Sequence, residues 1–131
     1  MSTTSSSRKG RKGKKETIDR DKALLITSSV PVEKGFHFFT EIKKPLDIFA
    51  TSIFEFSDEL KKVNPTSLEF HMKRNDFARW LRDVIRDDTL ANEFDKFQRV
   101  EIAGEKLRSR LVEITEKRCK ELAEALKGVG S

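Results

Sequence analysis

The spacing of the large apolar residues between positions 77 and 85 constrains the fold of this chain more than any other feature. Phe77, Trp80, Leu81, Val84 and Ile85 recur at steps of three, four, seven and eight residues. This is the pattern of an α-helix that buries one face and exposes the other. The stretch therefore predicts an amphipathic helix packed against a core.

Neighbouring segments carry the residues that commonly begin helices. The candidate N-caps are Ser52 with Glu55 three residues later, Asn64 followed by Pro65, Asn75, and Asp87 or Asp88. A last apolar stripe runs from about residue 100 to residue 126 and lapses at Arg118. These signals predict an all-α fold, a compact bundle of about five helices.

The segment before these helices has a different periodicity. In residues 36–43, Phe36, Phe38, Thr40 and Ile42 alternate with the other residues, and a period of two indicates extended chain. No second strand is evident, so we expect an extended segment or a minor ribbon that packs over the bundle. A single helical domain is therefore expected over residues 23–131.

Phenylalanine is the dominant aromatic residue, and its copies exceed what one helical face needs. The six in question are Phe36, Phe38, Phe39, Phe49, Phe54 and Phe56. Large apolar residues are usually buried, so we expect most of them in the core. The alternative is that some of them line a partner groove or a dimer surface.

Positive charge is concentrated near the N-terminus. Residues 8–15 hold six basic side chains and no acidic one: Arg8, Lys9, Arg11, Lys12, Lys14 and Lys15. Removing these six from the 27 basic residues leaves 21 against 22 acidic ones, so the rest of the chain is close to neutral. Residues 1–15 contain little that could be buried. We therefore interpret residues 1–22 as a flexible, disordered basic tail that is suited to nucleic-acid phosphates.

Several classes of protein are disfavoured by composition. The single Cys119 forms no internal disulfide, and with His37 and His71 it gives no zinc-binding spacing, so we expect neither metal nor cofactor. The sequence shows no apolar run of about 20 residues and no signal peptide, which favours a cytoplasmic protein without membrane contact. High charge with few Asn and Gln residues is also typical of thermophiles.

Residues 70–81, FHMKRNDFARWL, gather polar and aromatic side chains at a predicted helix junction. His71, Asp76 and Trp80 are expected to converge there, and a histidine beside a carboxylate is in principle an acid–base pair. Nucleophilic chemistry needs a third group, and Ser67 has no evident oxyanion hole beside it, so a structural role is favoured over catalysis. A ligand pocket is the remaining alternative. The row formed by Arg79, Arg82 and Arg86 is interleaved with aspartates, which indicates an ion-paired surface.

The same stretch carries a family resemblance. The residues are Ser67 to His71, then Arg74, Asn75, Asp76 and Phe77, then Trp80, Val84 and Asp88 to Ala91, with upstream support from Phe36 to Phe39 and Ser52 to Phe56. Over roughly residues 34–126 the chain resembles a family of small, uncharacterised helical domains found mainly in archaea and in some bacteria. The resemblance implies that His71, Arg74, Asn75, Asp76, Phe77 and Trp80 are a structural signature, and it implies no activity.

These observations predict a non-enzymatic accessory protein associated with nucleic acid. The partner is expected to be RNA within a ribonucleoprotein such as the ribosome, held by the tail. The first alternative is a protein-interaction or regulatory module that uses a Phe-rich surface. The second is a protein associated with DNA or chromatin.

Overall fold

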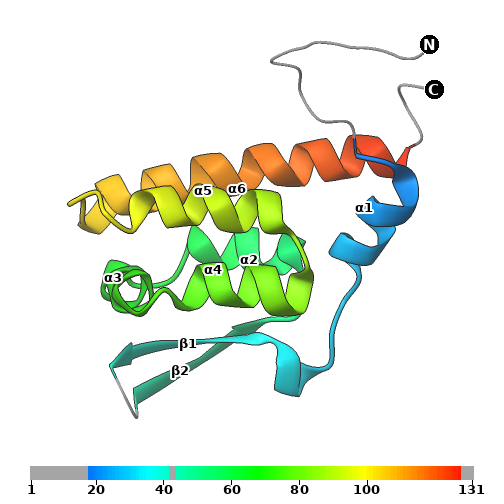
Figure 1. Ribbon diagram of the computed structural model, residues 1–131. Coiled ribbons are helices and arrows are strands. Elements are labelled where there is room, and N and C mark those ends of the chain that lie inside the picture. Colours follow the sequence, from blue (N-terminus) through cyan, green and yellow to red (C-terminus); the bar gives the residue numbers. More distant parts are fainter. Residues whose placement is uncertain (1–17, 42–43, 128–131) are drawn as a thin grey trace.

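The computed structural model describes residues 18–41 and 44–127 of the chain (Figure 1). These residues form six α-helices, a short 3-10 helix at Val32–Lys34, a π-helical turn at Leu81–Ile85 and one two-stranded antiparallel sheet. In chain order the elements are α1 Arg20–Thr27, β1 Phe36–Glu41, β2 Lys44–Ala50, α2 Ile53–Leu60, α3 Pro65–Arg74, α4 Asp76–Trp80, α5 Asp88–Phe97 and α6 Gly104–Leu126.

The elements are stacked in layers around one core. Helices α5 and α6 lie side by side on one side of the molecule, and the β1–β2 hairpin lies on the other, with α2, α3 and α4 between them (Figure 1). Strand β1 packs on α3, strand β2 packs on α2, and α1 lies against α6. The hairpin therefore covers a face of the helical layers instead of extending away from them.

The hairpin shows that the all-α prediction is wrong, because the fold is mixed α/β with helices predominating. The period of two correctly marks β1, and its partner is β2, with Phe36 opposite Ala50 and His37 opposite Phe49. Strand β2 is not evident from the sequence because Pro45 and Asp47 are unusual in strands. The register of the pair also shifts twice along its length. Asp47 has a positive φ of 59°, which departs from regular strand geometry.

At the other end of the hairpin, Gly35 meets a close approach of the chain. A Cβ atom at this position would lie 2.7 Å from the carbonyl oxygen of Ala50, so a side chain there would force the two segments apart. Earlier in the chain, α1 begins at Arg20 with Asp19 as its N-cap, so residues 20–22, assigned from the sequence to the tail, are helical. The basic residues 8–15 lie outside the described residues.

The predicted helix starts are largely confirmed. Ser52 accepts a hydrogen bond from the Glu55 backbone N–H, and the Glu55 carboxylate reaches back to Thr51. Asn64 caps α3 with Pro65 as the first helical residue. Asp87 caps α5 through the N–H of Leu90. Serine, asparagine and aspartate begin these helices because their side-chain oxygens satisfy N–H groups that have no intrahelical partner.

The core is rich in aromatic contacts between the hairpin and the helices. Phe36 of β1 lies 5.0 Å from Phe77 and 5.6 Å from Trp80 between ring centroids, and Phe77 lies 5.7 Å from Phe94. Of the six phenylalanines singled out in the sequence, Phe36, Phe38 and Phe56 are buried and Phe39 is half-buried. The remaining two, Phe49 and Phe54, are exposed. The set is thus divided between core and surface.

The gap in the apolar stripe of α6 is filled by a buried ion pair. Arg118 donates from Nε to Asp87 Oδ2 over 2.8 Å and from Nη2 to Asp87 Oδ1 over 2.9 Å. Its side chain is 7% exposed, and that of Asp87 is 1% exposed. Burial opposes the guanidinium charge, but hydrogen bonds from Arg118 to Asp87 outweigh it and raise the pKa of Arg118. The pair therefore joins α6 to the N-terminus of α5.

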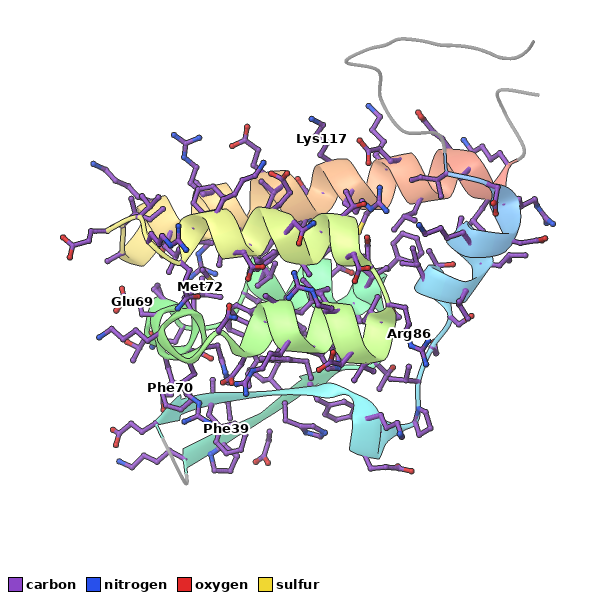
Figure 2. The ribbon with its side chains drawn as sticks, in the orientation of Figure 1. Phe39, Glu69, Phe70, Met72, Arg86 and Lys117 are labelled. Carbon is purple, nitrogen blue, oxygen red and sulfur yellow. The ribbon has the colours of Figure 1, made fainter. Side chains whose placement is uncertain are left out.

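Replacing Arg118 by methionine should destabilise the protein by about 3–5 kcal/mol, because Asp87 would remain as a buried charge without its partner. The measurement is the free energy of unfolding from urea denaturation at pH 7. Lys117→Met is the matched control, since Lys117 is the preceding residue on α6 and is exposed (Figure 2). The control should change stability by less than about 0.5 kcal/mol. Equal effects of the two substitutions would contradict the assigned role of the pair.

Candidate functional site

The signature residues lie where α3 ends and α4 begins. Asn75 adopts a left-handed conformation, with φ 61° and ψ 30°, and its N–H bonds back to the end of α3. The predicted N-cap position at the start of α4 is confirmed, but the Asn75 side chain makes no capping hydrogen bond there. Asparagine is one of the few residues other than glycine that adopts this conformation readily. The chain thereby changes direction between α3 and α4 (Figure 1).

This turn brings His71 and Asp76 together. Asp76 Oδ2 accepts a hydrogen bond of 2.8 Å from His71 Nδ1, and His71 Nε2 accepts one of 2.9 Å from the backbone N–H of Phe39. An amide N–H can only donate, so Nε2 carries no proton and the neutral ring is protonated at Nδ1. His71 is 2% exposed and has both ring nitrogens engaged. It fastens strand β1 to the α3–α4 junction.

Burial and hydrogen bonding set the charges at this junction. Burial lowers the pKa of His71 and outweighs the opposing effect of Asp76. For Asp76, burial would raise the pKa, but hydrogen bonds from His71 and Arg74 lower it below its usual value. Asp76 also forms an ion pair with Arg79. The expected state is thus a neutral histidine beside an ionised, well-satisfied carboxylate.

The other two signature residues anchor the junction to the core and to the hairpin. Phe77 is fully buried in the aromatic cluster. Trp80 is 7% exposed, and its indole Nε1 donates a hydrogen bond of 2.9 Å to the carbonyl oxygen of Lys34. These contacts fix the segment just before β1 against α4.

Beside the junction lies an open groove with a volume of about 510 Å³, called here the β1–α4 groove. Four signature residues line it: His71, Arg74, Asp76 and Trp80. Further lining residues come from β1, α3, α4 and the π-helical turn, and include Phe36, Phe39, Phe70, Arg79 and Asp83. Figure 2 shows Phe39 on the hairpin and Phe70 below α3, both at the end of the molecule away from α1. The signature thus forms one wall of a groove as well as a structural junction.

The sequence contained a signal for this groove. Phe39 is out of phase with the buried pair Phe36 and Phe38, and Phe70 is out of phase with Leu68 and Met72 on α3. Aromatic residues at such positions are directed away from the core, and here they line a concave surface. Their grouping depends on the hairpin, which the sequence did not predict.

The predicted row of arginines is divided by the structure. Arg79 pairs with Asp76, and Arg82 pairs with Asp95 and lies within 4.0 Å of Asp88. Arg86 adopts a left-handed conformation at the end of the π-helical turn and is exposed. Two of the three side chains are therefore compensated by acidic groups, as expected for an ion-paired surface.

Other potential reactive groups are scarce in the described part of the chain. Within residues 18–41 and 44–127, no group of three or more His, Cys, Asp and Glu residues is arranged to hold a metal ion. Burial raises the pKa of Cys119 to about 11, so the thiol is protonated at neutral pH. Among the helices that the structure describes, none is long and apolar enough to span a bilayer. The six basic residues proposed to bind phosphates lie outside the described residues.

A protein-family model described as a family of unknown function (DUF5752) matches residues 33–128. The chain belongs to this family. The match confirms the resemblance to an uncharacterised family and covers the hairpin, the junction and the groove, while residues 8–15 precede it. No curated protein and no solved structure matches the chain.

The structure predicts an acid-dependent loss of stability that originates at His71. The folded pKa is below the unfolded one, so the unfolded chain takes up a proton that the folded chain does not. The free energy of unfolding should therefore be fully retained above about pH 6.5 and decline as the pH is lowered. Protonated Nε2 would also oppose the Phe39 N–H, which is itself a donor.

The test compares urea denaturation of the wild type and His71→Gln between pH 7.5 and 5. The variant should be less stable by about 1–3 kcal/mol at pH 7.5, because it disrupts two partly buried hydrogen bonds. The difference from wild type should narrow toward pH 5. His37→Gln is the control and should retain the wild-type pH dependence, because it leaves the His71 contacts intact. Parallel curves for wild type and His71→Gln would contradict the assignment.

Proposed function

We propose that this protein is a non-enzymatic accessory protein that binds nucleic acid, with RNA in a cytoplasmic ribonucleoprotein such as the ribosome as its main partner. The observation that carries the proposal is the separation of charge along the chain. Six basic residues and no acidic one stand within residues 8–15: Arg8, Lys9, Arg11, Lys12, Lys14 and Lys15. The rest of the chain is near neutral in formal charge.

The ion pairs of the folded part support this division. Arginine side chains on α6 and the π-helical turn are paired with acidic groups: Arg82 with Asp95, Arg108 with Glu105, and Arg118 with Asp87. Compensated charges exert little attraction on a distant polyanion. The basic side chains best suited to phosphate contacts are therefore those within residues 8–15, where pairs of basic residues are separated by glycine.

The signature histidine is consistent with a non-enzymatic role. Both ring nitrogens of His71 are bound to protein groups, so neither is available to move a substrate proton without breaking a contact. The β1–α4 groove beside His71 is better suited to binding a ligand than to acid–base catalysis. Binding without catalysis is thus the proposal that the geometry favours.

The proposal predicts strongly salt-dependent binding to single-stranded RNA. For a single strand, six phosphate contacts give a slope of about −4 in a plot of log affinity against log salt concentration, or a loss of roughly 300-fold between 50 and 200 mM salt. The triple variant Lys12→Gln, Lys14→Gln, Lys15→Gln should make the slope shallower by about 2. Fluorescence anisotropy with a labelled 20-nucleotide RNA measures both quantities.

The matched control removes the same number of charges from the folded part. Lys106, Lys117 and Lys120 are exposed on α6, and replacing all three by glutamine should change the slope by less than the tail variant does. If the two triple variants weaken binding equally, affinity comes from total charge and the assignment to residues 8–15 fails. Repeating the titration with duplex DNA of equal length tests the DNA or chromatin alternative.

A protein-interaction or regulatory module is the second candidate. The observation that favours it is the exposure of Phe49 and Phe54, which are 42% and 37% exposed. This candidate predicts self-association, or a complex with a defined partner, that persists at high salt, where the electrostatic contribution of the tail is screened. Light scattering after size exclusion of the wild type and of Phe49→Ser, Phe54→Ser detects self-association. A monomer in both cases removes the support for a dimer.

A further inference from the structure

The β1–α4 groove combines aromatic surface with arginine at one end. Phe39 from β1 and Phe70 from α3 are half-buried and line the groove, while Phe36 and Trp80 form its buried part. The centroids of Phe39 and Phe70 lie 6.3 Å and 5.0 Å from that of His71, so the two rings stand near the same buried imidazole. This end of the groove therefore offers aromatic contact surface from two different elements.

Arginine stands next to this aromatic surface. The guanidinium carbon of Arg74 lies 5.3 Å from the centroid of the Phe70 ring, and Nε donates to Asp76 over 3.0 Å. Among the hydrogen bonds of the described residues, the two terminal nitrogens of Arg74 have no partner. The Arg74 and Arg79 side chains are 48% and 57% exposed. With a neutral His71, the two arginines and Asp76 have a formal charge of +1, and Asp83 brings the lining of the groove as a whole to zero.

We propose that the β1–α4 groove binds one nucleotide of a single-stranded RNA. Its base would pack against Phe39 and Phe70, and its phosphate would lie at Arg74 and Arg79. The inference rests on the proposed function, because it adds a short-range site to binding through residues 8–15. Bases that are free of a duplex stack on aromatic side chains and on guanidinium planes, and arginine binds phosphate with several parallel donors.

The charged residues of the lining determine where a phosphate could lie in the groove. Asp83 also lines the groove, and its exposed carboxylate would repel a phosphate. Arg74 lies next to the Phe70 ring, and Arg74 and Arg79 together would attract an anion. A planar ring next to an anionic group is the chemistry that matches this end, and a nucleotide has both. The same chemistry is present in a free mononucleotide, so the experiment has to separate the two sources.

Trp80 provides a direct signal for occupation of the groove. It is the single tryptophan of the chain, the chain has no tyrosine, and Trp80 lines the groove. The experiment titrates the full-length protein with octa-adenylate RNA, with AMP and with an eight-base-pair RNA duplex, and follows tryptophan fluorescence. It is repeated for Phe39→Ala, Phe70→Ala, Phe70→Tyr and Arg74→Gln. Phe54→Ala is the control, since Phe54 is exposed and does not line the groove.

The expected result is saturable quenching of Trp80 by the octanucleotide, with weaker binding of AMP and of the duplex. Loss of either ring should weaken binding of the octanucleotide by roughly 5- to 150-fold, as found when one stacked base loses its aromatic partner. Phe70→Tyr and Phe54→Ala should bind like the wild type. Urea denaturation of each variant shows whether it is folded. Phe70→Tyr keeps the aromatic ring and leaves no cavity, so it separates loss of the ring from a change in packing.

The inference is overturned if Phe39→Ala, Phe70→Ala and Arg74→Gln, each shown to be folded, bind the octanucleotide as tightly as the wild type. Equal affinity for AMP and the octanucleotide would assign the groove to free nucleotides, and preference for the duplex would exclude base stacking. The Lys12, Lys14, Lys15 variant separates the two proposals. If its salt slope becomes shallower by about 2 while the groove variants bind normally, the tail proposal stands and the groove proposal fails. If the groove variants lose affinity while the lysine variant keeps the wild-type salt slope, the groove proposal stands and the tail proposal fails.

Discussion

The imidazole of His71 is the contact on which the arrangement of this fold depends. It accepts a hydrogen bond from the Phe39 backbone in the hairpin and donates one to Asp76 at the start of α4, so one side chain connects three elements. The contact with Phe39 requires an unprotonated Nε2, and burial favours that neutral state. The hairpin then holds Phe36 in the aromatic core and Phe39 at the groove. A single protonation state thus supports both the packing and the shape of the groove.

The helical part of the fold could be predicted because its signals are local. A capping side chain acts within three residues of the helix start, and the apolar pattern of residues 77–85 follows from the pitch of one helix. The sheet depends on pairing between segments, and Pro45 and Asp47 hide the second strand. The same reason explains the groove: its residues come from β1, α3 and α4, and the sequence did not predict their meeting without the hairpin.

Polar residues at apolar positions proved informative in this chain. The stripe of α6 lapses at Arg118 because that side chain meets Asp87, which also caps α5. Burying one charge alone is strongly unfavourable, so such a pair is retained or lost as a unit. Asn75 shows a different limit of sequence analysis. Its side chain suggested a helix start, but its left-handed backbone conformation is what separates α3 from α4.

The two proposed contacts with RNA would act over different distances. In the proposed function, charges in residues 8–15 would attract phosphates over about a Debye length and would not distinguish one sequence from another. Stacking in the groove requires contact and an unpaired base, so it separates single strands from duplexes. The folded part has most of its arginines paired internally, which leaves the groove arginines Arg74 and Arg79, bound to one carboxylate, as a short-range positive group. In this arrangement the tail would increase the rate of encounter, and the groove would determine which encounters last.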